Sequence, residues 1–139
     1  MQVHASCAAR DGAGVLLLGP PGAGKSDMVV RLLAYGFMLV ADDRVEIADG
    51  CARPAPGLAG LLEVRGLGIL RLPHLPQATL RLAVALGPAA PRLPEPARHA
   101  CPDLPLLALD PTRPSAAQVV ALALDCALGR IAQVAGAFA

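Results

Sequence analysis

Apolar runs and alternating apolar positions divide the first part of the chain into short strands. The run 15–18 is apolar at every position, which is typical of a strand buried on both faces of a sheet. Residues 2–9 precede it across the turn signal Asp11-Gly12, so we expect these two segments to form a hairpin. A further buried strand is expected at 37–41.

Apolar residues at helical spacing predict one helix between these strands and another near the end of the chain. The first is expected from about Lys25 to Gly36, where glycine can terminate it. Its inner face would consist of Met28, Val29, Leu32 and Leu33. The second helix is expected from a cap at Ser115 to about residue 135.

Between these helices the pattern favours short strands and irregular segments. Strands are expected at 45–47, 61–64, 80–86 and 106–109. Asp49-Gly50 marks a turn, and six prolines between residues 87 and 105 predict an extended, irregular excursion. Neither an internal repeat nor a linker divides the sequence, so we expect residues 1–139 to form a single α/β domain.

The composition excludes several classes of protein. Hydrophobic residues make up 55% of the chain and charged residues 17%, which excludes disorder through low hydrophobicity. A net charge of +1 and 2% aromatic residues argue against a nucleic-acid-binding protein. Gln118, Asp125 and Arg130 interrupt the apolar C-terminal stretch, so no membrane span is expected. Without a signal-peptide pattern or a CxxC pair, the sequence predicts a cytoplasmic protein with reduced cysteines.

The segment between the first buried strand and the first helix matches the phosphate-binding pattern G-x-x-x-x-G-K-[ST] at every fixed position. Its glycines let successive amides turn toward a phosphate, and the helix N-terminus adds partial positive charge. Lys25, the only lysine of the chain, supplies a mobile charge, and the Ser26 hydroxyl can complete a Mg²⁺ shell. We therefore predict that a nucleotide or another polyphosphate binds at Gly19, Pro20, Pro21, Gly22, Ala23, Gly24, Lys25 and Ser26.

Two adjacent carboxylates, Asp42 and Asp43, follow the strand after the first helix. In a parallel sheet this strand would return beside the strand at 15–18, which precedes the phosphate-binding loop (P-loop, residues 19–26). Ligands bind at the carboxyl ends of such strands. One carboxylate could then hold Mg²⁺ while the other accepts a proton from an attacking hydroxyl. The other interpretation is a solvated turn that only ends the strand.

Three further residues have two interpretations each from the residues alone. His4 is either a structural strand histidine or part of the site. Alternation along a strand would place Glu63 and Arg65 on one face, where they form either a surface ion pair or a metal ligand beside a charge-neutralising arginine.

Taken together, these segments resemble the catalytic C-terminal domain of the HPr kinase/phosphorylase family. His4-Ala5-Ser6 matches the family's histidine motif, and Val40-Ala41-Asp42-Asp43 matches its paired-aspartate element. Leu62–Ile69 matches the signature Leu-Glu-(Ile/Val)-Arg-Gly-(Leu/Val)-Gly-Ile, which ordinary P-loop proteins do not carry. The resemblance covers essentially the whole chain in a short form that lacks the family's N-terminal domain. It implies a mixed sheet like the nucleotide-binding core of phosphoenolpyruvate carboxykinase, and a homohexamer.

The resemblance also implies an activity and a role for each residue. The activity is the ATP- and Mg²⁺-dependent phosphorylation of a serine of HPr or an HPr-like phosphocarrier protein, together with phosphorolysis of the phosphoserine that releases pyrophosphate. Lys25 would hold the β-phosphate, Ser26 and Glu63 would hold Mg²⁺, and Asp43 would be the base. The other catalytic residues implied are His4, Asp42, Arg65, Arg92 and Arg113. The loop of Arg113 lacks a second arginine and an asparagine of the family, which puts the phosphorolysis in question.

Two other functions stay open at this point. One is a small-molecule P-loop kinase, against which the chain shows no arginine-rich lid segment. The other is a nucleotide-sensing regulatory protein without turnover. Such a sensor needs the phosphate-binding loop but no base, so the retention of Asp43 argues against it.

Overall fold

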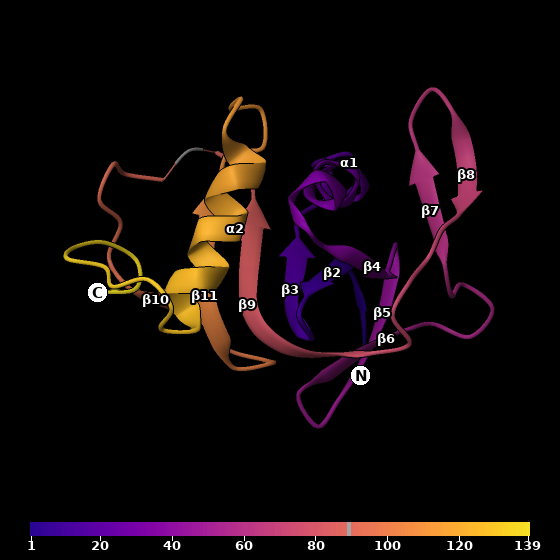
Figure 1. Cartoon of the computed structure of the whole chain (residues 1–139), viewed down its shortest axis with the longest axis horizontal. Helices are drawn as coiled ribbons and strands as arrows, with labels where there is room; N and C mark the ends of the chain where they lie inside the picture. Colours follow the sequence, from indigo (N-terminus) through magenta and orange to yellow (C-terminus); the bar gives the residue numbers. More distant parts are fainter. Residues whose placement is uncertain (89) are drawn as a thin grey trace.

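The described part of the chain folds into a curved sheet with two α-helices packed against it (Figure 1). The computed structural model describes residues 1–88 and 90–139; Ala89, within the predicted irregular excursion, lies outside them. In chain order the elements are β1 (Gln2–His4), β2 (Ser6–Arg10), β3 (Ala13–Leu18), α1 (Lys25–Leu32), η1 (Leu33–Tyr35), β4 (Met38–Ala41), β5 (Arg44–Ala48), β6 (Cys51–Pro54), β7 (Leu61–Val64), β8 (Gly68–Arg71), β9 (Ala78–Leu86), β10 (Ala97–His99), β11 (Leu104–Leu109) and α2 (Ala116–Ala127).

Nine strands of the described residues form one mixed sheet. Its main path runs β1-β5-β6-β9-β3-β2-β4, and β11, which also pairs with β10, joins β9. The long strand β9 is parallel to β3 and β11 but antiparallel to β6. The expected mixed α/β sheet is thereby confirmed.

The position of β4 differs from the expectation for a parallel sheet. Instead of lying beside the P-loop strand β3, β4 pairs with β2, which pairs with β3 in turn. The reason is that the β2–β3 hairpin occupies one edge of β3 and β9 occupies the other. Two antiparallel steps leave β4 running in the same direction as β3, so its carboxyl end still lies at the P-loop edge of the sheet.

The single strand predicted at 2–9 is wrong, because the chain changes partners at Ala5. Before Ala5, β1 pairs with β5; after it, β2 pairs with β3 and β4. Ala5 is fully buried, and its amide donates to the carbonyl of Asp43 at 3.3 Å. This crossover brings the end of β1 to the end of β4.

The first helix begins at Lys25 and, through η1, reaches Gly36 as predicted. Met28, Val29 and Leu32 are fully buried, but Leu33 is 38% exposed. Leu33 is the first residue of η1, none of whose residues is buried, so the buried face ends at Leu32. Gly36, at φ 83°, then ends the helical segment.

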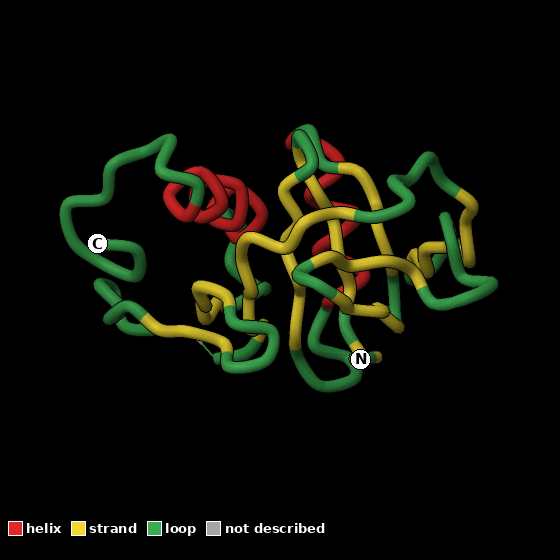
Figure 2. The backbone as a smooth tube through the Cα atoms, turned by 90° about the horizontal axis from the view of Figure 1, so that it is seen from below, coloured by secondary structure: helices red, strands yellow, loops and turns green. Residues whose placement is uncertain are grey.

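The last helix is shorter than predicted. It ends at Ala127, where Gly129 adopts φ 74°, and the chain beyond it runs as a loop to the C-terminus (Figure 2). Ser115 precedes the helix but makes no side-chain capping bond. The apolar residues beyond 129 belong to a loop that packs on the core, as the buried Ala137 shows, and not to a longer helix.

Apolar clusters lie on both faces of the central strands. Val15 and Leu17 of β3 belong to the cluster that includes α1 and α2, whereas Leu16 belongs to the cluster that includes β1, β5 and β6. Neighbouring strand residues point to opposite faces, so an uninterrupted apolar run is what this arrangement requires. The prediction of a strand buried on both faces is confirmed.

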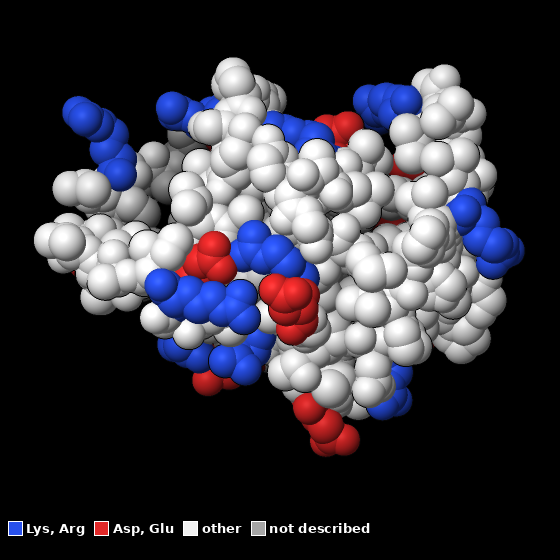
Figure 3. Space-filling model, in the orientation of Figure 1, with Lys and Arg blue, Asp and Glu red and all other residues white. Residues whose placement is uncertain are grey.

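A charged contact joins the end of β2 to α2. Arg10 of β2 donates to the carboxylate of Asp125 at 2.7 Å and lies 5.0 Å from the ring centre of Phe37. Figure 3 shows side chains of both signs next to one another on the viewed face. Within the described residues, no helix is long and apolar enough to cross a membrane.

Candidate active site

The P-loop connects β3 to α1 and packs tightly on the neighbouring strand. Gly19 has φ 155°, and a Cβ at this position would lie 2.9 Å from the Ala23 Cβ and 3.1 Å from the carbonyl oxygen of Leu86. The first distance is shorter than real Cβ contacts and the second is unusually tight, so glycine is favoured here. The loop therefore rests on the carboxyl end of β9 as well as on β3.

Lys25 closes the loop on itself. Its Nζ donates to the carbonyl oxygens of Gly19 at 2.7 Å and of Pro20 at 3.0 Å. An ammonium group has three donors, so one stays available for a phosphate oxygen. Lys25 is thus held at the loop as a positive charge with a free donor.

Asp42 is the most connected side chain of the site. Its Oδ1 accepts hydrogen bonds from the hydroxyls of Ser26 and Ser6, each at 2.7 Å, and its Oδ2 accepts from the amide of Glu63 at 3.4 Å. It is only 7% exposed. Three separate elements (α1, β2 and β7) therefore converge on one carboxylate. The contact of Asp42 with Ser26 was not expected from the sequence, because the family resemblance implied Ser26 and Glu63 as the pair that holds Mg²⁺.

Asp43 has the opposite environment, because β4 ends at Ala41 and strand alternation no longer applies. The amide of Arg44 donates to the carbonyl of Asp42 at 2.8 Å in a tight bend, and Asp43 itself adopts φ 68°. Positive φ is uncommon outside glycine and is sometimes found at functional sites. The bend leaves Asp42 buried and Asp43 exposed to solvent.

Glu63 and Arg65 belong to the β7–β8 hairpin, a separate two-stranded sheet that stands apart from the main sheet (Figure 1). The amide contact with Asp42 places Glu63 at the site, and its side chain is exposed. Arg65 follows the end of β7, in a turn that the bond from the Leu67 amide to the Val64 carbonyl closes at 2.9 Å. The expected alternation of Glu63 and Arg65 along one strand is therefore wrong.

His4 lies at the end of β1, opposite Arg44 of β5. Its side chain is exposed, and the next residue, Ala5, bonds to the backbone of Asp43. The fold thus brings the backbone of His4 next to the paired aspartates.

The loop that carries Arg113 lies against the P-loop helix. Arg31 of α1 donates to the carbonyls of Pro111 at 2.7 Å and of Arg113 at 3.2 Å. The loop is also held internally, because the Asp110 carboxylate accepts from both the amide and the hydroxyl of Thr112. These bonds lower the pKa of Asp110 below its usual value. The side chain of Arg113 is exposed.

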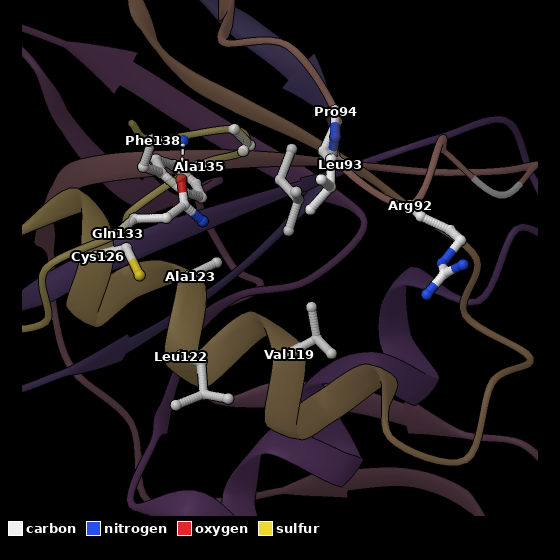
Figure 4. A pocket seen from close by; sticks show the side chains of 13 residues that line it. Arg92, Leu93, Pro94, Val119, Leu122, Ala123, Cys126, Gln133, Ala135 and Phe138 are labelled. Carbon is white, nitrogen blue, oxygen red and sulfur yellow. Dashed lines mark hydrogen bonds between the residues drawn. The ribbon is translucent and has the colours of Figure 1, made fainter.

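Arg92 lies at one end of a cavity of about 210 Å³ whose other end is formed by Gln133 and Phe138 (Figure 4). Val119 and Ala123 of α2 line the cavity between them. Among the described residues, no hydrogen bond joins Arg92 to the P-loop. Its catalytic role stays a prediction.

Known proteins resemble this chain in sequence and in fold. The family described as HPr Serine kinase C-terminal domain matches residues 1–76. The HPr kinase/phosphorylase of Bordetella pertussis is 47% identical over 68 residues, which are 42% of this chain and 21% of the relative. That of Neisseria meningitidis serogroup A is 44% identical over 69 residues, or 45% of this chain and 21% of the relative. The matched region therefore spans about a fifth of the length of these curated relatives.

The fold similarity extends further along the chain than the sequence similarity. The solved structure of the Hpr(Ser) kinase/phosphatase from Coxiella burnetii matches with a TM-score of 0.74 at 20% identity. The match covers 94% of this chain and 92% of that structure. The arrangement of the second half is thus similar even where the family match in sequence has ended.

Proposed function

We propose, from the premise that this chain belongs to the HPr serine kinase C-terminal domain family, that it phosphorylates a serine of HPr with ATP. The observation that carries the proposal is the contact of Ser26 with the buried Asp42, directly beside the exposed Asp43. One carboxylate supports the P-loop hydroxyl, and its neighbour is free to meet a substrate hydroxyl. Phosphoryl transfer uses groups that hold the phosphates and the metal and a residue that orients or deprotonates the nucleophile, and the two carboxylates fit these two roles.

The oxygen groups at the site suit Mg²⁺. Magnesium prefers hard oxygen ligands and is usually held by one or two protein groups together with phosphates and water. Ser26 and Glu63 would hold the ion, as in the family, with Asp42 behind Ser26. Bound Mg²⁺ would neutralise charge on the β- and γ-phosphates of ATP.

The residues of the chain would bind the phosphates and move one proton. Lys25 and the P-loop amides hold the β-phosphate. Asp43 accepts the proton of the substrate serine while the serine oxygen bonds to the γ-phosphorus, and the bond to the ADP oxygen breaks. His4, Arg65, Arg92 and Arg113 would balance the negative charge of the phosphoryl group during transfer.

The reverse direction uses the same groups. An oxygen of inorganic phosphate attacks the phosphoserine, the bond between phosphorus and the serine oxygen breaks, and pyrophosphate is released. Asp43 then returns its proton to the serine oxygen. Arg31 fixes the loop of Arg113 against α1. Because this loop lacks a second arginine and an asparagine of the family, the chase with inorganic phosphate described below decides whether this second activity is part of the function.

The exposure of the site favours a protein substrate over a small molecule. Beside Asp42, the β7–β8 hairpin presents Leu67 and Ile69, which are 70% and 72% exposed. Exposed apolar side chains of this kind are available for contact with a protein surface. A cytoplasmic location and a homohexameric assembly complete the proposal, and light scattering after size-exclusion chromatography tests the assembly.

The test is mass spectrometry of HPr from the same genome after incubation with this protein, ATP and Mg²⁺. We expect one phosphate on a serine, and none with a Lys25→Ala variant. Arg98→Ala, which changes an exposed residue of β10, serves as the matched control and should phosphorylate HPr normally. A chase with inorganic phosphate should remove the phosphate and release pyrophosphate. Unmodified HPr in a sample that binds ATP would contradict the proposal and favour another substrate or a nucleotide sensor.

A further inference from the structure

Ser6 and Asp42 are the buried polar side chains among the described residues, and they are hydrogen-bonded to each other. Ser6 begins β2 and is 0% exposed. Its neighbours Ala5, Cys7 and Ala8 are also buried, so the surroundings are those of an apolar core. A buried hydroxyl needs a partner to offset the loss of water, and the Asp42 carboxylate supplies it.

Two hydroxyls fix the same carboxylate oxygen. Ser6 from β2 and Ser26 from α1 both donate to Asp42 Oδ1 at 2.7 Å. The contact at Oδ2, from the Glu63 amide, is longer at 3.4 Å. Without Ser6, Oδ1 would be held by Ser26 alone, and the carboxylate could rotate away from it.

The orientation of Asp42 decides where the Ser26 oxygen can act. A serine hydroxyl has one proton and two lone pairs. Because the proton of Ser26 is directed at Asp42, the lone pairs face away from Asp42 and are free to bind a cation. If Asp42 rotated, it would no longer accept the hydrogen bond from Ser26, and the Ser26 hydroxyl would lose its fixed orientation.

We propose that Ser6 is a positioning residue, which holds Asp42 so that the Ser26 oxygen is oriented toward a divalent cation bound with the nucleotide. The proposal rests on the proposed function, because it needs a cation and a nucleotide at the P-loop. Ser6 touches neither of them and acts through Asp42 and Ser26. Removing its hydroxyl weakens cation binding and leaves the phosphate contacts of Lys25 unchanged.

The experiment measures Mn²⁺ affinity by electron paramagnetic resonance, in the presence of a saturating non-hydrolysable ATP analogue. Groups that orient metal ligands typically change metal affinity about 10- to 100-fold when removed. We expect Ser6→Ala to weaken Mn²⁺ binding by about this factor. Its affinity for the analogue without metal should equal that of the unchanged protein.

Three comparisons keep the test specific. Cys7→Ala removes a buried thiol from the same strand. The Cys7 sulfur lies near the Ala8 carbonyl and not at Asp42, so this variant should keep its Mn²⁺ affinity. Ser6→Thr keeps the hydroxyl and should restore affinity to within about threefold of the unchanged protein, well inside the loss typical of removing such a group. Equal Mn²⁺ affinity of Ser6→Ala and the unchanged protein, or equal losses in Ser6→Ala and Cys7→Ala, overturns the role of Ser6. If the unchanged protein does not bind Mn²⁺ with the analogue, the proposed function fails instead.

Discussion

Asp42 and Asp43 are adjacent in sequence and differ in both surroundings and contacts. Asp42 accepts hydrogen bonds from Ser6, Ser26 and the amide of Glu63, whereas Asp43 is exposed. The strand β4 ends at Ala41, and Asp43 adopts a positive φ. As a result, the two side chains point into different environments. We therefore propose that Asp42 supports the Ser26 hydroxyl that would hold the cation, and that Asp43 transfers the proton.

The cysteines give a prediction at the same scale. Burial raises the pKa of Cys7 to about 12, so its reactive thiolate is scarce at neutral pH. Cys101 is exposed. We expect iodoacetamide at pH 8 to label Cys101 in the folded protein and to leave Cys7 unlabelled, with both labelled in guanidinium chloride. Mass spectrometry of peptides checks this, and equal labelling in the folded state would show that β2 opens readily.

Single residues of the site were predictable from the sequence to different degrees. The P-loop follows from a local pattern, which is why Lys25 and Ser26 are found without a structure. The contact between Ser26 and Asp42 is not local, because it depends on β2 lying between β3 and β4. Ser6 was missed as a site residue, although a serine among Ala5, Cys7 and Ala8 in a buried strand is a signal that could have indicated it.

At the scale of elements, the β7–β8 hairpin is attached to the molecule on one side only. Leu62 is fully buried in the cluster that includes α1, whereas Leu67 and Ile69 are exposed. Leu62→Ala should lower the free energy of unfolding by about 2–5 kcal/mol, the usual cost of a large buried side chain. Leu67→Ser, the matched control, should change it by no more than about 0.5 kcal/mol.

Chemical denaturation measures both variants of the hairpin. A small effect of Leu62→Ala would mean that the hairpin is not anchored through this residue, and that the contact of Glu63 with Asp42 is transient. A large effect of Leu67→Ser would contradict its exposure in the monomer and would indicate that another surface covers it.

Helix ends and strand partners were the parts of the elements that sequence patterns did not predict correctly. The pattern placed α1 well, because Gly36 gives a local stop signal. It extended α2 too far, because the apolar residues after Gly129 pack as a loop. The pattern also predicted β1 and β2 as one strand. No local signal at Ala5 shows that the chain pairs with β5 before this residue and with β3 after it.

At the scale of the whole molecule, both halves of the chain build one sheet. The P-loop strand β3 from the first half pairs with β9 from the second, and β9 pairs with β11. Residues 1–76, which the family matches in sequence, contain the P-loop, the paired aspartates and Glu63. They lack β9, whose terminal Leu86 supports Gly19 of the P-loop.

A fragment of residues 1–76 should therefore fail to fold and to bind ATP. Without β9, one edge of β3 is unpaired and its apolar side chains lose a neighbour, which leaves too little buried surface for a stable domain. Circular dichroism and nucleotide titration, with the full chain as control, check this. A folded fragment that binds ATP would show that the second half is dispensable for the site.

The most direct test of the account compares Asp43→Asn with Asp42→Asn in two assays on the same samples, nucleotide binding with Mn²⁺ and phosphate transfer to HPr. The account predicts that Asp43→Asn binds like the unchanged protein and transfers about 10²- to 10⁴-fold more slowly, the usual contribution of a general base. Asp42→Asn should lose Mn²⁺ affinity as well. If Asp43→Asn transfers phosphate at the unchanged rate, or loses binding and transfer to the same degree, Asp43 is not the base and the central claim is wrong.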